Sequence, residues 1–242
     1  MKRLVTMIVL IGFGMPAAAD DAGSRDVDRQ VLGAWQLEFT APDGVHRNPV
    51  VLVGRQYTSY VAWYVADGEP QPFKTVQLQG DKLVGTITPK ERPDVTVTCE
   101  STLRAADQCE GKATYRTKDG SDSGQWGFIG KRLAMSSFGE VMKWDLSFTT
   151  PDDKQYEAAI TVVSKNGKMY AWYSSDDLEL LARSISVEGD RVEVKIATET
   201  PEGVPVEVTF RGTVAGDDVT GDAEYRLNGE TGTFPFKAKR AS

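Results

Sequence analysis

Few side chains in this sequence have the types and spacing that catalysis requires. His46 is the only histidine, and Gln155 stands at the corresponding position 109 residues later. A histidine base needs a nearby nucleophile and an orienting carboxylate, and the sequence contains no G-x-S-x-G elbow. One histidine also cannot anchor the usual ligand sets of zinc. We therefore expect His46 to be a solvated loop residue, and we expect no metal site and no cofactor.

Acidic residues are plentiful, and two carboxylates would be enough for a glycosidase. Most of the acids occupy turns or the polar positions of alternating segments, where solvated carboxylates are expected, and no pair stands out from the rest. The sequence therefore predicts a protein that is not an enzyme.

Two aromatic segments offer binding chemistry instead. Residues 60–64 (YVAWY) and 169–173 (MYAWY) are related by an offset of 109 positions. Successive side chains of a β-strand point to opposite faces, so each Trp faces away from the Tyr that follows it. We place the Ala and Tyr face inside and the Trp face outside. The candidate ligand-binding residues are Tyr60, Trp63, Tyr64, Tyr170, Trp172 and Tyr173.

The two outward Trp side chains need cover, because burial of an indole contributes several kcal/mol at about 25 cal/mol per Å². Either the two repeats or a loop cover them, or they form an exposed aromatic platform for a sugar or a peptide. Both interpretations remain open.

Cys99 and Cys109 are the only cysteines. In an oxidising compartment, a lone pair at this spacing suggests a disulfide. A hairpin turn centred on Arg104 would bring the two thiols face to face. A turn nearer residues 106–107 would move them several residues out of register, beyond the reach of a disulfide. We expect the disulfide and keep the second register as the alternative.

Residues 1–19 have the form of a cleaved signal peptide. Lys2 and Arg3 precede an apolar run that is too short to span a bilayer, and three small residues, 17–19, follow it. We predict a periplasmic or extracellular protein with no membrane span after processing. The net charge of −7 and the lack of Lys and Arg clusters argue against a nucleic-acid partner.

The elements that position these residues are repeated along the chain. Residues 35–39 (WQLEF) alternate apolar and polar side chains, and residues 144–148 (WDLSF) repeat the pattern at the same offset of 109. Toward the end of each repeat the offset drifts to 110 and then to 108. The sequence therefore predicts a tandem duplication, with repeats at 26–133 and 140–241.

The second repeat contains eight strand-like runs separated by turn sequences. Asn-Gly pairs such as 166–167 and 228–229 favour tight hairpins. No long helical pattern is present to cover a sheet, so closure into a barrel would remove the sheet edges. We predict an all-β fold of two tandem, eight-stranded, antiparallel up-and-down β-barrels. The runs are 143–149, 156–164, 168–174, 182–187, 191–197, 204–214, 219–227 and 231–239.

The segment from Gly33 to Trp35 resembles the G-x-W signature of lipocalins and the wider calycin group. In that family the Trp closes one end of the barrel and packs against an Arg at the end of the last strand. The resemblance therefore implies two structural pairs, Trp35 with Arg132 and Trp144 with Arg240. The second repeat departs from the signature, because Met142 replaces the Gly. The tail of each repeat is similar to lipocalin-like domains of secreted bacterial proteins. Such domains are often appended to hydrolases.

These features favour a secreted, non-enzymatic β-barrel protein that binds a small apolar ligand, a glycan or a partner protein. An eight-stranded barrel can hold one small ligand or be filled by side chains, so a structural or protein-interaction module with filled barrels is the alternative. An accessory or inhibitor protein of a secreted hydrolase is suggested by the resemblance alone. Ligand binding predicts a cavity behind Tyr64 or Tyr173.

Overall fold

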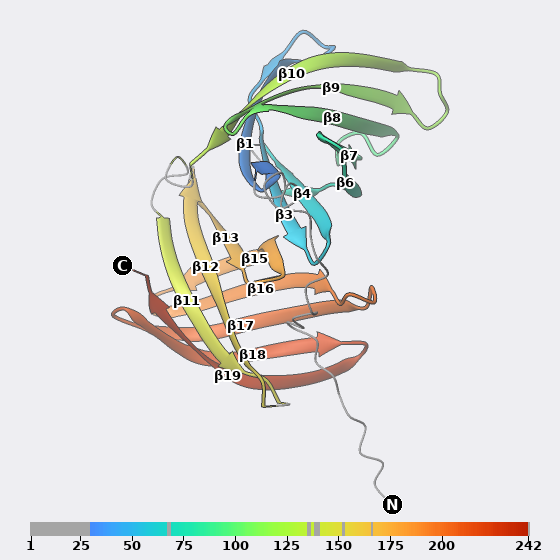
Figure 1. The fold of residues 1–242 in the computed structure, drawn as a ribbon. Coiled ribbons are helices and arrows are strands. Elements are labelled where there is room, and N and C mark those ends of the chain that lie inside the picture. Colours follow the sequence, from blue (N-terminus) through green and yellow to red (C-terminus); the bar gives the residue numbers. More distant parts are fainter. Residues whose placement is uncertain are drawn as a thin grey trace, which may run out of the picture. The chain divides into compact units, whose positions relative to one another are not determined.

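The computed structural model describes residues 30–66, 69–134, 137, 141–151, 153–165 and 167–241, and the segment interpreted as a signal peptide lies outside them. The chain divides into two compact units between residues 137 and 138, which we call the first and the second unit in chain order. Strands make up both units (Figure 1). Within the described residues, no helix is both long enough and apolar enough to cross a membrane.

The first unit is a set of antiparallel strands, most of which pair with the next strand along the chain. The last long strand, β10, pairs back with β1, and β1 also pairs with β3. The strands of the first unit are β1 (Gly33–Thr40), β2 (His46–Arg47), β3 (Val50–Gln56), β4 (Ser59–Val65), β5 (Gln71–Pro72), β6 (Thr75–Gln79), β7 (Lys82–Ile87), β8 (Val95–Ala105), β9 (Gln108–Thr117) and β10 (Ser123–Leu133).

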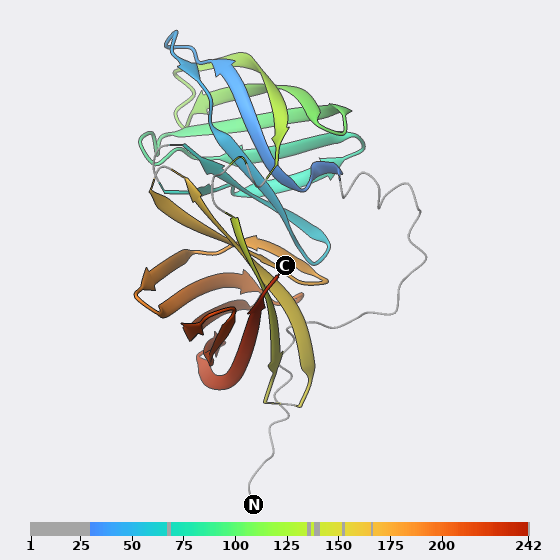
Figure 2. The same ribbon diagram turned by 90° about the vertical axis from the view of Figure 1, so that its left-hand side faces the viewer.

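The segment from β5 to β6 closes the ring between β4 and β7. Its start pairs with β4, and its end pairs with β7. Between the two, the backbone N–H of Phe73 donates to the carbonyl of Ala62 at 2.9 Å, and that of Lys74 donates to Thr86 at 2.7 Å. Hydrogen bonding therefore continues around the unit, and the strands curl into a barrel-like ring (Figure 2).

The second unit repeats this pairing pattern. The last strand, β19, pairs back with the first, β11, and the N–H groups of Ala182 and Arg183 bridge from β13 to β16 at 2.8 and 2.7 Å. Its strands are β11 (Val141–Thr149), β12 (Gln155–Lys165), β13 (Lys168–Ser174), β14 (Leu178–Leu181), β15 (Ser184–Glu188), β16 (Arg191–Glu199), β17 (Pro205–Ala215), β18 (Asp218–Leu227) and β19 (Glu230–Arg240).

The expected all-β antiparallel architecture is confirmed, with one strand that the sequence did not predict. β14 pairs with β13 through residues 179–181. It follows two acidic residues, and it is only four residues long (LELL), so it lacked the sustained alternation by which the other strands were predicted.

Alternating side chains form the interior of each unit. In β19, Phe234, Phe236 and Ala238 are buried, and the residues between them are exposed. This period of two is what a sheet with one packed face requires. Because the same cross-strand partners recur in both units, each interior position of one has a counterpart in the other.

Candidate functional site

The interior of the first unit is hollow in two places. A cavity of about 70 Å³, the inner cavity, lies at the end closed by Trp35. A larger one of about 230 Å³, the outer cavity, extends to the opposite rim. Five side chains line both cavities and mark the boundary between them: Leu37, Val51, Phe73, Cys99 and Phe128.

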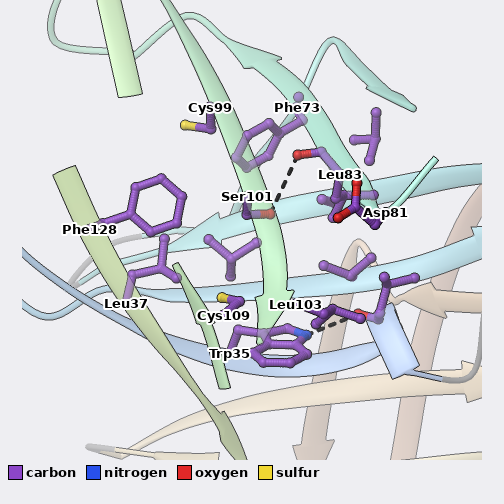
Figure 3. Close-up of a pocket in the computed structure, with 16 residues that line it drawn as sticks. Trp35, Leu37, Phe73, Asp81, Leu83, Cys99, Ser101, Leu103, Cys109 and Phe128 are labelled. Carbon is purple, nitrogen blue, oxygen red and sulfur yellow. Dashed lines mark hydrogen bonds between the residues drawn. The ribbon is translucent and has the colours of Figure 1, made fainter. Parts of the chain in front are cut away.

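The inner cavity is small and almost wholly apolar. Figure 3 shows Phe73 and Cys99 at one end of it and Trp35 at the other. The indole N–H of Trp35 donates to the carbonyl of Val31 at 2.9 Å, and the Ser101 hydroxyl donates to that of Leu83 at 3.4 Å. These polar groups are therefore satisfied within the wall. At about 30 Å³ per water molecule in the liquid, this cavity has room for about two water molecules and is too small for an organic ligand.

Trp35 closes this end of the first unit together with Arg132. The two residues face each other across β1 and β10, and the Arg132 guanidinium carbon lies 4.6 Å from the centroid of the indole ring. The same guanidinium donates to the carbonyls of Ala106 at 2.9 Å and Leu32 at 2.6 Å. Gly33 has a φ of 110°, and a Cβ there would lie 3.1 Å from Arg132 Nη1. Both facts favour glycine in the G-x-W segment.

The corresponding pair in the second unit has a different environment. Trp144 and Arg240 also face each other across neighbouring strands. Trp35 is 4% exposed, however, whereas Trp144 is only half-buried and Arg240 is exposed. At this end of the second unit, Met142 occupies the position that Gly33 has in the first unit.

The outer cavity has an apolar wall and a polar rim. Phe39, Ile87 and Trp126 contribute to the wall. At the rim, Arg47 makes an ion pair with Asp43 at 2.6 Å, and the Gln71 side-chain oxygen accepts from the Lys90 backbone at 3.2 Å. The remaining charged side chain of the rim is Glu91. The Val45 N–H and the Arg47 guanidinium hold the pKa of Asp43 below its usual value.

Phe73 is the divider between the two cavities. Its ring lies on Gly85 of β7, since a Cβ at that position would come within 2.8 Å of the ring. The backbone hydrogen bond from Phe73 to Ala62 fixes the residue at the junction of β4 and β6. The ring of Phe73 therefore leaves no room for a side chain at position 85.

The second unit is filled where the first unit has its outer cavity. Cys99 faces Ala113 across β8 and β9, and Phe210 faces Ala223 across β17 and β18, so Phe210 stands at the position of Cys99. The Phe210 ring lies 6.2 Å from that of Phe148, 6.5 Å from Tyr173 and 5.3 Å from Phe236 by centroid distance.

A second aromatic side chain completes this filling. Arg47 faces Phe39 in the first unit, whereas Tyr156 faces Phe148 in the second and stacks on it at 5.5 Å. We call the resulting cluster the aromatic plug. Its members are Phe148, Tyr156, Tyr173, Phe210, Phe234 and Phe236. The space occupied by the Phe210 and Tyr156 rings is the space that the outer cavity leaves open.

The six aromatic residues proposed from sequence lie in four different environments. Tyr64 lines the outer cavity, so a cavity is present behind Tyr64. Tyr173 is 4% exposed and belongs to the plug, where its ring packs against that of Phe210. Tyr60 packs against the core at the inner cavity. Alternation places Trp63, Tyr170 and Trp172 on the faces opposite the buried Ala62 and Ala171; burial raises the pKa of Tyr170.

The predicted disulfide between Cys99 and Cys109 is wrong, because both thiols are free. β8 ends at Ala105 and β9 begins at Gln108, so the turn lies at residues 106–107, as in the alternative register. Cys109 faces Leu103, four positions along the strand from Cys99. At about 3.3 Å per residue this offset is roughly 13 Å, about twice the separation that a disulfide spans.

Both thiols are protonated at neutral pH. Burial raises the pKa of Cys99 to about 12 and that of Cys109 to about 11. The thiolate, rather than the thiol, is the nucleophile and metal ligand, so both cysteines act as small apolar wall residues.

The outer surface carries the lone histidine. His46 is exposed, and its Nε2 lies 3.5 Å from a carboxylate oxygen of Glu38. Neither residue lines the inner or the outer cavity. Among the residues that the structure describes, no group of three or more potential metal ligands comes together.

Sequence reasoning missed the residues that decide which unit is hollow. Phe73, Trp126 and Phe210 were not singled out. Comparison of the repeats could have revealed them, but Cys99 and Phe210 are 111 positions apart, two more than the offset of 109 used to align the earlier strands. At an offset of 109, Cys99 aligns instead with Val208, and the exchange of a thiol for a ring is hidden.

Comparisons with known proteins identify no close relative. No family model matches the chain, and no curated protein matches it. A transferrin binding protein B mutant from Haemophilus parasuis is 12% identical over 86% of this chain and 45% of its own, with a TM-score of 0.29. A protein of unknown function from Nostoc punctiforme is 9% identical over 89% and 98%, with a TM-score of 0.28. Scores this low do not establish a common fold.

Proposed function

We propose that the protein is secreted and non-enzymatic, that its two units are tandem eight-stranded β-barrels, and that the first barrel binds a small apolar molecule. The observation that carries this proposal is the outer cavity of about 230 Å³, which extends to the rim of the first unit. Eight strands of the first unit support it, if β2 and β3 count as one strand of the ring and the β5–β6 segment as another. The periplasmic or extracellular location rests on residues 1–19 alone.

The volume of the outer cavity sets the size of the ligand. An apolar cavity of 150 Å³ holds benzene, so by proportion the outer cavity holds about nine non-hydrogen atoms. Octanol and naphthalene are close to this size. The boundary residue Phe73 keeps a longer chain from continuing into the inner cavity.

The wall favours an apolar ligand over a glycan. Phe39, Val51 and Ile87 would face the hydroxyl groups of a sugar without a hydrogen-bonding partner, and each unpaired hydroxyl costs about 1–3 kcal/mol. An apolar body meets no such penalty. The rim residues Arg47 and Glu91 leave room for a polar end group at the solvent side.

The protonated cysteines support the non-enzymatic assignment, since neither supplies a nucleophile to the cavity. The runner-up is a structural or protein-interaction module with filled barrels. The aromatic plug favours that role for one end of the second unit. An accessory protein of a secreted hydrolase rests on the resemblance alone.

Isothermal titration calorimetry with octanol and naphthalene tests the proposal. The matched variant transplants the second unit's residues into the first, as Phe73→Ala, Gly85→Val and Cys99→Phe together. Cys99→Ser, which keeps the side-chain volume, is the control. We expect binding to the natural protein and to the control, and at least about tenfold weaker binding to the triple variant.

Two outcomes would overturn the proposal. If neither ligand gives heat at concentrations up to their solubility, the filled-barrel module is the better description. If the triple variant binds as well as the natural protein, the ligand lies elsewhere. Should the triple variant not fold, Ile87→Trp blocks the same cavity from a single position in its wall. Comparison of octanoate with octylamine then tells which of Arg47 and Glu91 meets the polar end.

A further inference from the structure

The second unit contains a cavity that the proposed function does not use. It measures about 410 Å³ and lies at the Trp144 end, where Phe210 and Phe236 of the aromatic plug border it. It is the counterpart of the inner cavity of the first unit, which measures about 70 Å³. Its wall includes Met142, Trp144, Leu146, Val192, Val214 and Val219.

Smaller side chains at matched positions explain the larger space. Val192 stands where the first unit has Leu83, as the pairing of β16 with β17 and of β7 with β8 shows. Val214 likewise stands where the first unit has Leu103. Each exchange removes one methylene group from the wall. Ala182, in place of Phe73, removes a whole ring from the middle of the unit.

The Trp144 end is also less tightly closed than the Trp35 end. In the first unit, the carbonyls of Gln30, Val31 and Leu32 accept hydrogen bonds from Trp35 and Arg132, and these residues cover the end. In the second unit, Trp144 is half-buried and lines the cavity. Val187, another residue of the wall, is 44% exposed, and Asp190 lies in the exposed turn between β15 and β16. The cavity therefore reaches solvent at this turn.

The composition of the wall defines the class of ligand. Among the described residues that line it, Asp190 is the one charged side chain, and it lies at the solvent edge. Arg240 faces Trp144 across the strands, but it is exposed and outside the wall. A buried carboxylate of a ligand would therefore find no basic partner here, whereas a neutral or cationic end group would meet the Asp190 carboxylate or water.

We propose that the second unit binds a neutral or cationic lipophile, which enters at the Trp144 end, opposite the aromatic plug. By proportion to benzene in a 150 Å³ cavity, about sixteen non-hydrogen atoms fit. The volume also falls in the usual range of ligand pockets, about 300–1,000 Å³. This site is independent of the outer cavity of the first unit and takes a larger ligand.

Tetradecylamine, tetradecanol and tetradecanoate test the site, because they share a chain of fitting length and differ in the charge of the end group. Each is titrated into the full protein by calorimetry, below its micelle concentration or, for the alcohol, below its solubility limit, and the tryptophan fluorescence of the protein gives a second readout. We expect the amine and the alcohol to bind. Asp190→Asn should weaken the amine about threefold, as for an exposed ion pair, and leave the alcohol unchanged.

Two blocking variants and a matched control locate the binding. Val214→Phe and Val192→Phe each place a ring in the cavity, and each should weaken tetradecanol about tenfold or more. Leu103→Phe makes the same kind of change at the counterpart of Val214 in the first unit and should leave tetradecanol binding within about twofold. If one blocking variant does not fold, the other still gives the answer.

Three results would overturn the proposal: no binding of any of the three compounds, equal binding to the natural protein and to a folded blocking variant, or tighter binding of tetradecanoate than of the amine. The triple variant of the first unit, with Phe73→Ala, Gly85→Val and Cys99→Phe, should not affect tetradecanol. Failure of this site and failure of the outer cavity are thus separately visible.

Discussion

Removal of the Trp35 side chain should destabilise the first unit far more than removal of Trp144 destabilises the second. Trp35 is 4% exposed, donates its indole N–H to Val31, and carries the Arg132 guanidinium on its face. Trp144 is half-buried and borders a cavity of about 410 Å³. The two residues stand at the same position of the repeat, so the comparison isolates their surroundings.

The magnitude follows from the buried area. A Trp side chain buries roughly 150–250 Å², which at about 25 cal/mol per Å² corresponds to roughly 4–6 kcal/mol. The hydrogen bond to Val31 contributes about 1 kcal/mol, and collapse of the wall into the space would return part of the total. We expect Trp35→Ala to lower the free energy of unfolding by about 3–5 kcal/mol. For Trp144→Ala we expect roughly half of that loss.

Urea unfolding combined with hydrogen-exchange mass spectrometry measures both effects, because peptides from β1 and β11 report on the two units separately. Trp35→Phe serves as a control that keeps a ring and loses the N–H donor. Equal losses for Trp35→Ala and Trp144→Ala would refute the reasoning. So would a loss below about 1 kcal/mol for Trp35→Ala, since a closed end cannot lose its central ring so cheaply.

Three further outcomes are expected. Without reductant, thiol titration in denaturant should find two free thiols per chain; none would restore the disulfide of Cys99 and Cys109. The folded-state pKa of Cys99 is raised from 9.0 to about 12. The free energy of unfolding should therefore be unaffected by this thiol below pH 9 and fall above it, by roughly 1.4 kcal/mol between about pH 7 and pH 10. Urea unfolding should show a smaller fall for Cys99→Ser. Ala182→Phe, Val194→Gly and Phe210→Cys together should weaken tetradecanol binding at least about tenfold, as measured by calorimetry, because they place an aromatic ring where Ala182 leaves the cavity open.

Much of the fold could be predicted because it depends on local patterns. Alternation in residues 35–39 and 144–148, and turn sequences between the runs, specify antiparallel strands without knowledge of their partners. The resemblance to the lipocalin G-x-W signature implied that Trp35 packs against Arg132, and the two residues are cross-strand neighbours. These features need only the period of two and the chemistry of turns.

The cysteine register could not be predicted, because it depends on one turn. A turn centred on Arg104 and a turn at residues 106–107 are both compatible with the sequence between the two cysteines. The structure has a bulge between Leu103 and Ala105, where the pairing shifts. A bulge adds one residue to one strand, and no composition rule locates it, so the disulfide could be neither derived nor excluded.

The cavities were beyond sequence reasoning for a different physical reason. The size of a cavity is the difference between the volume that the strands enclose and the volume of the side chains inside, and both volumes depend on residues from several strands. Tyr64 and Tyr173 are equivalent in the repeat, yet one faces a cavity and the other a packed ring. What distinguishes them is Phe210, which lies on another strand.

The location of the cavity depends on which strand supplies the aromatic side chain at the middle of the interior. In the first unit the ring comes from Phe73, which Gly85 accommodates, and Cys99 leaves the rim side open. In the second unit it comes from Phe210, and Ala182 leaves the Trp144 side open. Because the strand pairing is the same in both units, the different location of the empty space follows from side chains at matched positions. The two interiors therefore differ in the side chains that fill them and not in the pairing of their strands.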